Sequence, residues 1–205
     1  MEKSGAAHDL YNSSKNDYYW DVVMNLFNCQ EGLCAYTEIQ LCSQIYYIST
    51  NWNSKGEWIN PDHPSNPEVN GQLEHFNPNL KKNKAWLWDN FFMADTNINT
   101  KIKKKKEVDD ILKPDRKGYD EFDLLSYNRA THLFIANPKH LPAIQARINK
   151  MIITLGINFR PIKDQRKMYL NLIIKTINAK LDTWDNVTIK QFPTAFEMIK
   201  REINL

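Results

Sequence analysis

The spacing of apolar and polar residues predicts a mainly helical chain. Apolar residues recur every three or four positions over residues 18–29, which is the period of an amphipathic helix, and Gly32 is expected to end that helix. The same reasoning predicts helices over residues 143–155, 163–180 and 188–204. The helix over residues 163–180 is expected to bury three apolar side chains: Met168, Leu172 and Ile173.

A strand–loop–strand–helix unit is predicted in the middle of the chain. Residues 73–76 and 89–94 each have the pattern of a short strand, and polar segments with a proline separate them. Asp95 or Thr96 can cap a helix that continues to about Val108, because short polar side chains accept the free N–H groups of a first helical turn.

The remaining segments are predicted to be less regular. Short strands are expected at residues 33–36 and 131–136, whereas residues 50–71 are rich in proline and asparagine and should form a loop. Residues 38–47 fit either a strand or a helix.

Composition supports one folded domain of the α+β class. Among 205 residues, 42% are hydrophobic and 12% aromatic, enough to bury a core. We expect an N-terminal helical segment (1–32), a core with the central strand–loop–strand–helix unit (33–130) and a C-terminal helical region (131–205).

The net charge of +3 hides an asymmetry along the chain. Residues 1–70 contain 3 basic and 9 acidic side chains, whereas residues 71–205 contain 24 basic and 15 acidic ones. A basic surface favours a polyanionic substrate such as nucleic acid, although lysines also serve simply to solvate a surface.

The cysteines and the hydropathy indicate a cytoplasmic protein. Cys29, Cys34 and Cys42 are odd in number, and no secretory signal accompanies them, so reduced thiols are expected. No apolar run approaches the roughly 20 residues of a membrane span, and we expect no membrane association.

Glu74 and His75 are the first candidate functional residues. A neutral imidazole can accept a proton from water near neutral pH, so His75 is a candidate general base. The carboxylate of Glu74 and the amide oxygen of Asn99 are ligands that suit Mg²⁺, which keeps several waters in its coordination shell. Adjacent side chains on a strand point to opposite sides, so Glu74 and His75 can serve one site only at a twisted or terminal position of the strand.

Three further residues complete the candidate site. Asn90 can accept a hydrogen bond from the second ring nitrogen of His75 and thereby select its tautomer. Lys101 and Lys103 begin a run of five lysines in six positions and can hold flanking phosphates. Each residue alone has an ordinary structural explanation, and only the combination points to phosphodiester hydrolysis.

These residues resemble an HNH endonuclease, a one-metal nuclease built on a β-hairpin and a helix. The similarity is greatest to the HNH subunit, PtuB, of Septu-type anti-phage systems, which also occurs with some retrons. Four segments carry it: Cys34-Ala35-Tyr36-Thr37-Glu38, Leu73-Glu74-His75-Phe76-Asn77-Pro78, Trp88 to Lys101, and Leu155-Gly156-Ile157-Asn158 with Arg166.

The resemblance implies a role for each candidate residue. His75 corresponds to the general base, and Asn90 to the asparagine that orients it. Glu74 and Asn99 correspond to the ligands of one divalent cation, Mg²⁺ or Mn²⁺, with Asn97 as the ligand if the helix register differs by two.

One departure from the family concerns zinc. Many relatives bind a structural zinc through two cysteine pairs, but Thr37 stands where the first pair would have its second cysteine. Asp95 and Ile98 lie where the second pair would be. We therefore expect no structural zinc.

The resemblance also implies partners and leaves alternatives open. Septu-type nucleases act with an ABC-type ATPase subunit, PtuA, so a PtuA-like partner is expected. DNA is the favoured substrate, and RNA such as tRNA is the alternative. Two other functions compete with the nuclease. One is a non-catalytic nucleic-acid-binding scaffold, and the other is an enzyme that uses Cys34 and a histidine, although a buried inert thiol is the ordinary explanation of Cys34.

Overall fold

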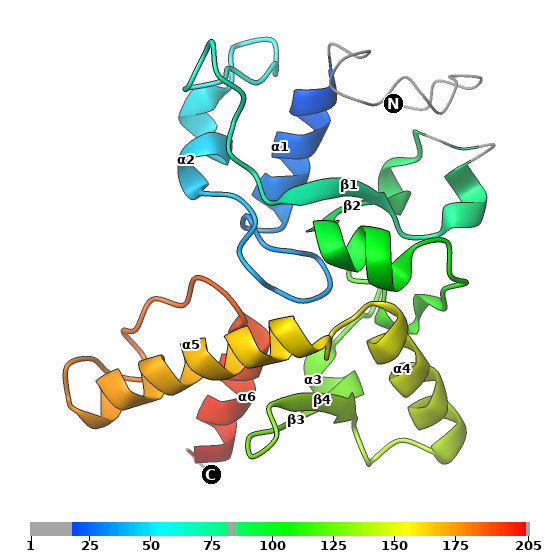
Figure 1. The fold of residues 1–205 in the computed structure, drawn as a ribbon, viewed down its shortest axis with the longest axis vertical. Helices are drawn as coiled ribbons and strands as arrows, with labels where there is room; N and C mark the ends of the chain where they lie inside the picture. Colours follow the sequence, from blue (N-terminus) through cyan, green and yellow to red (C-terminus); the bar gives the residue numbers. More distant parts are fainter. Residues whose placement is uncertain (1–17, 82–83, 85, 204–205) are drawn as a thin grey trace. The chain divides into compact units, whose positions relative to one another are not determined.

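The structure, a computed structural model, describes residues 18–81, 84 and 86–203. It has an α+β fold in which the described strands form two antiparallel hairpins (Figure 1). The chain divides into two compact units. The first unit extends to Ala35 and resumes from Gln40 to Val108, whereas the second contains Tyr36–Ile39 and everything from Asp109 onward. The longer uninterrupted part of the second unit therefore begins after residue 108.

The first unit contains the strand–loop–strand–helix segment expected from the sequence. Its elements are α1 (Tyr19–Cys29), α2 (Gln44–Tyr47), η2 (Ser49–Asn51), β1 (Gly71–His75), η3 (Pro78–Lys81), η4 (Trp88–Asn90), β2 (Phe91–Asp95) and η5 (Ile98–Lys103). The predicted helix over 18–29 and the two predicted strands are confirmed to within two residues. Residues 38–47 contain single bridge residues, Gln40 and Cys42, and then the short helix α2.

Helix α1 supplies much of the core of the first unit. Its buried residues recur with helical spacing: Val23, Met24, Leu26 and Phe27. The helix packs on β2 and is followed by Gly32, whose φ is +74° and whose N–H donates to the carbonyl of Phe27 (2.8 Å). Gly32 therefore ends the helix as predicted.

The surroundings of Gly32 make a stability prediction possible. A Cβ at this position would lie 2.5 Å from the carbonyl oxygen of Cys42, whereas one at Gly56, with a similar φ of +76°, would meet nothing within 4 Å. Both alanine variants carry the strain of a left-handed backbone, about 1–2 kcal/mol. Gly32→Ala should cost about 1–3 kcal/mol more, because backbone must move.

Urea unfolding followed by tryptophan fluorescence measures this difference. All tryptophans except Trp184 lie in the first unit, so the signal reports on it. Equal free energies of unfolding for Gly32→Ala and Gly56→Ala would contradict the close approach at Gly32.

The helix after β2 is shorter than the sequence suggested. Asp95 caps it as expected, since its Oδ1 accepts the N–H groups of Asn97 (2.9 Å) and Ile98 (3.0 Å). However, η5 is a π-helix that ends at Lys103, and Lys104 adopts a φ of +52°. The prediction of a helix to Val108 is wrong. Neighbouring like charges oppose a helix through the lysine run, and no apolar face supports one there.

The second unit combines a hairpin with three longer helices. Its elements are η6 (Asp110–Leu112), α3 (Glu121–Leu124), β3 (Leu125–Asn128), β4 (Leu133–Ala136), α4 (Pro142–Thr154), α5 (Arg160–Asn178) and α6 (Pro193–Ile203). Helix α4 packs on β4, and α6 packs on β3. The three C-terminal helices and the strand near 131–136 are confirmed, whereas β3 was not predicted.

Helix α5 buries a different face from the one predicted. Met168 and Leu172 are 74% and 63% exposed, and Ile173 is only half-buried. The buried positions are Ile162, Arg166, Leu170 and Ile177. The prediction failed because Arg166, which is fully buried, lies at the centre of the face that packs on the core. The pattern of apolar residues alone would place an arginine on the solvent-facing side of the helix.

Segment 36–39 caps the last helix of the second unit. The carboxylate of Glu38 accepts hydrogen bonds from the backbone N–H (3.1 Å) and the hydroxyl of Thr194, in the first turn of α6. Its carbonyl oxygen also accepts from the N–H of Phe192 (2.9 Å). A carboxylate at a helix N-terminus satisfies N–H groups that lack an intrahelical partner.

In the described part of the chain, every helix is too short or too polar to span a membrane.

Candidate nuclease site

Glu74 and His75 lie at the end of β1, the strand-end position that their shared role would require. The antiparallel register pairs Glu74 with Phe92 and His75 with Phe91. Each of these two residues is only 5% exposed. The His75 ring meets the ring of Phe91 edge to face, with 4.9 Å between centroids. Aromatic packing therefore restricts the orientation of the imidazole.

Asn90 holds the backbone that follows His75. Its side-chain oxygen accepts from the N–H of Asn77 (2.7 Å), and its amide nitrogen donates to the carbonyl of Asn77 (3.1 Å). The N–H of Phe76 donates to the carbonyl of Asn90 (2.9 Å). These bonds extend the pairing of the two strands beyond His75. The proposed bond from Asn90 to the imidazole stays a prediction.

The carboxylate of Glu74 is paired with Lys103. The Lys103 ammonium donates to Oε1 of Glu74 and to the carbonyl oxygen of His75, the latter at 3.0 Å. The side chain of Lys103 is 0% exposed and that of Glu74 is 6% exposed. Burial raises the pKa of Glu74, while the ammonium groups of Lys103 and Lys81 oppose that rise.

Lys103 therefore has a different position from the one expected. A side chain that is fully buried does not reach flanking phosphates at the surface, whereas Lys101 is exposed and suited to that role. Sequence reasoning missed the pairing with Glu74. The spacing from Asn99 to Lys103 is the signal that could have revealed it, because residues four apart share one helix face.

Asn99 lies along the same face of β1 as the Glu74–Lys103 pair. Its amide nitrogen is 3.4 Å from Oε1 of Gln72, two residues before Glu74, and side chains two apart on a strand share a face. Helix η5 thus crosses this face with Asn99 above Gln72 and Lys103 above Glu74. Asn97 is exposed, which makes Asn99 the better-placed of the two candidate ligands.

The oxygen atoms at this position suit a hard cation. Oε1 of Glu74 and the carbonyl oxygen of His75 both accept hydrogen bonds from the Lys103 ammonium. The ammonium lies where a metal ion bound by these two oxygen atoms would lie. Carboxylate and carbonyl oxygens are ligands that Mg²⁺ accepts, so the chemistry of these two donors fits the expected ion, and Asn99 as a further ligand stays a prediction. Among the described residues, no group of three or more His, Cys, Asp or Glu side chains forms a metal site.

The three cysteines are free thiols in the described structure. Cys29 is exposed, whereas Cys34 and Cys42 are buried. Burial raises the pKa of Cys42 to about 12, and Cys34 Sγ accepts a bond from the N–H of Asp95 (3.4 Å). The burial of Cys34 agrees with an inert thiol. The absence of structural zinc stays a prediction.

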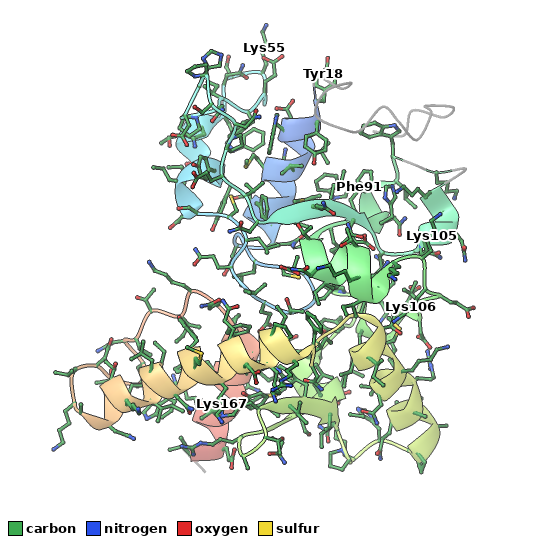
Figure 2. The ribbon with its side chains drawn as sticks, viewed as in Figure 1. Tyr18, Lys55, Phe91, Lys105, Lys106 and Lys167 are labelled. Atoms are coloured by element: carbon green, nitrogen blue, oxygen red, sulfur yellow. The ribbon has the colours of Figure 1, made fainter. Side chains whose placement is uncertain are left out.

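Exposed lysines follow η5 in the first unit. Lys104, Lys105 and Lys106 are all exposed, and the last two are labelled in Figure 2. Burial lowers the pKa of Lys81; the charge of Glu74 opposes this effect, and the charges of Lys105 and Lys103 add to it. Several positive charges therefore gather near Glu74.

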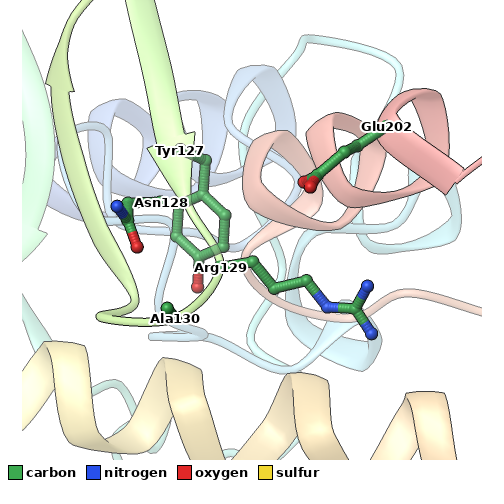
Figure 3. Close-up of a pocket in the computed structure, with 5 residues that line it drawn as sticks. All are labelled: Tyr127, Asn128, Arg129, Ala130 and Glu202. Atoms are coloured by element: carbon green, nitrogen blue, oxygen red, sulfur yellow. The ribbon is translucent and has the colours of Figure 1, made fainter.

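The second unit contains a separate surface hollow of about 640 Å³. It is lined by Tyr127, Asn128, Arg129, Ala130 and Glu202 (Figure 3). None of these belongs to the candidate site: the end of β3, the exposed turn that follows it and α6 supply the lining.

Comparison with known proteins adds no family assignment: no family model, curated protein or solved structure matches this chain.

Proposed function

We propose that this chain is a metal-dependent endonuclease of the HNH type that hydrolyses phosphodiester bonds, with DNA favoured over RNA. It would be the nuclease subunit of an anti-phage complex containing an ABC-type ATPase. The observation that carries the proposal is the end of β1, where Glu74 and His75 are adjacent and two of their oxygen atoms bind the Lys103 ammonium of η5.

The residues divide the chemistry among them. His75 would accept the proton of the attacking water as the water oxygen bonds to phosphorus. Glu74 and Asn99 would hold Mg²⁺, which when bound offsets negative charge on the phosphate and on the departing oxygen. Asn90 holds the backbone beyond His75, and this limits displacement of the base.

The exposed lysines would bind the nucleic acid by its phosphates. Lys101 and the residues from Lys104 to Lys106 are exposed, so they can contact a backbone without a base preference. Binding should weaken as salt rises, since each contact releases counterions.

Cleavage assays with two substrates test the proposal. Purified protein is incubated with supercoiled plasmid DNA and with tRNA, in Mg²⁺, in Mn²⁺ and in EDTA, alone and with its ATPase partner. We expect cation-dependent cleavage of plasmid DNA that declines as salt rises. Intact DNA and tRNA in every condition, including with the partner, would refute the nuclease.

A non-catalytic nucleic-acid-binding subunit is the second candidate. The near-complete burial of His75 and the pairing of Glu74 with Lys103 favour it, because neither group faces open solvent. The same assays decide: salt-sensitive binding without hydrolysis supports this alternative.

A further inference from the structure

Lys103 occupies an unusual position for a lysine. Its side chain is fully buried, although lysine is rarely buried unless its charge is paired. Two oxygen atoms on adjacent residues, Oε1 of Glu74 and the carbonyl of His75, receive its ammonium group. The ammonium is thus bound in the manner of a coordinated cation.

The site already contains more positive than negative charge. Lys103 pairs with Glu74, and the charges of Lys81 and Lys105 act on the same cluster. A divalent ion placed on Glu74 while Lys103 stays would add two further positive charges within a poorly solvated space. Strong repulsion there makes simultaneous occupancy unfavourable.

We infer that Lys103 is an internal competitor of the divalent cation at Glu74, so that the ion ligates Glu74 only in molecules where the Lys103 ammonium has left. The inference rests on the proposed function and concerns regulation of the same site. The ion can bind only to the fraction of molecules in which the Lys103 ammonium has left Glu74. Its apparent affinity is therefore the intrinsic affinity multiplied by that fraction.

The competition has a consequence for variants. Methionine has nearly the length of lysine and no charge, so Lys103→Met can fill the same buried space and leave Glu74 without its ammonium. The binding site for a cation should then be permanently available. Lys101→Met is the matched control, since it removes the same charge from an exposed position on the same helix.

Mn²⁺ binding, measured by electron paramagnetic resonance without nucleic acid, tests the inference. Lys103→Met should bind Mn²⁺ at least about tenfold more tightly than the wild type, and Lys101→Met should not. Adding Glu74→Gln to Lys103→Met should abolish the gain. Equal affinity in wild type and Lys103→Met, or a gain that survives Glu74→Gln, would overturn the competition.

A second measurement uses the unaltered protein, in case Lys103→Met does not fold. A buried, bonded ammonium exchanges its protons slowly enough to give a side-chain ¹⁵N signal, assigned by its loss in Lys103→Arg. Saturating Mg²⁺ should shift or remove this signal as the ammonium leaves Glu74. An unchanged signal at saturation would overturn the inference. Neither readout depends on hydrolysis, so an inactive nuclease and a failed competition give different results.

Discussion

Replacement of His75 by alanine should lower the rate of phosphodiester cleavage by about 10²–10⁴-fold, the usual contribution of a positioned general base. The imidazole stands at the end of β1 beside Glu74, and its ring packs on Phe91. Its loss removes the group that would accept the proton of the attacking water. Single-turnover cleavage of plasmid DNA, with protein in excess, measures the chemical step directly.

A second histidine provides the matched control. His132 has the same 5% exposure but belongs to the second unit, where it bonds to the Tyr127 hydroxyl. His132→Ala should leave the cleavage rate of the folded fraction unchanged, with circular dichroism used to determine that fraction. Cleavage by His75→Ala within about tenfold of wild type, in a preparation free of other nucleases, would exclude His75 as the base.

Replacement of Arg166 by methionine should destabilise the second unit by about 2–5 kcal/mol, because each buried oxygen atom that loses its donor costs about 1–3 kcal/mol. The guanidinium donates to the carbonyls of His132 (2.9 Å) and Ile157 (3.1 Å) and to Oδ1 of Asn158 (3.2 Å). Its centre lies 4.8 Å from the ring centroid of Phe134. Methionine keeps the apolar volume but leaves buried acceptors without donors.

The neighbouring residue provides the control for this change. Lys167 is exposed, and Lys167→Met should alter the free energy of unfolding by no more than about 0.5 kcal/mol. Urea unfolding followed by the fluorescence of Trp184, in a variant whose other tryptophans are phenylalanine, isolates the second unit. Similar unfolding free energies for the two substitutions would mean that Arg166 does not organise this core.

Local pattern was sufficient for most of the elements that surround the candidate site, although not for the length of η5. The apolar period of α1 and the capping by Asp95 depend on interactions within a few residues, and the strand character of β1 and β2 is visible in their own residues. The four-residue strand β3 was missed because its pairing with β4, not its own sequence, stabilises it.

The features that the sequence pattern did not predict depend on contacts between residues far apart in the sequence. The bond from Lys103 to Glu74, 29 residues earlier, joins two distant segments of the sequence, and only the spacing from Asn99 to Lys103 points to it. Likewise Asn158, in one of the segments on which the sequence-based HNH interpretation rests, forms two bonds with the backbone of Phe134 and one with Arg166. That segment therefore has a structural role in the second unit.

The assignment of residues 36–39 to the second unit matters for anyone dissecting the protein. A truncation that starts at Asp109 would omit Glu38, and with it the acceptor for the first N–H groups of α6. Such a fragment should fray at its last helix even though all its own elements are present. Separating the two halves calls for a circularly permuted or fused design that carries this tetrapeptide along, and not for a single cut.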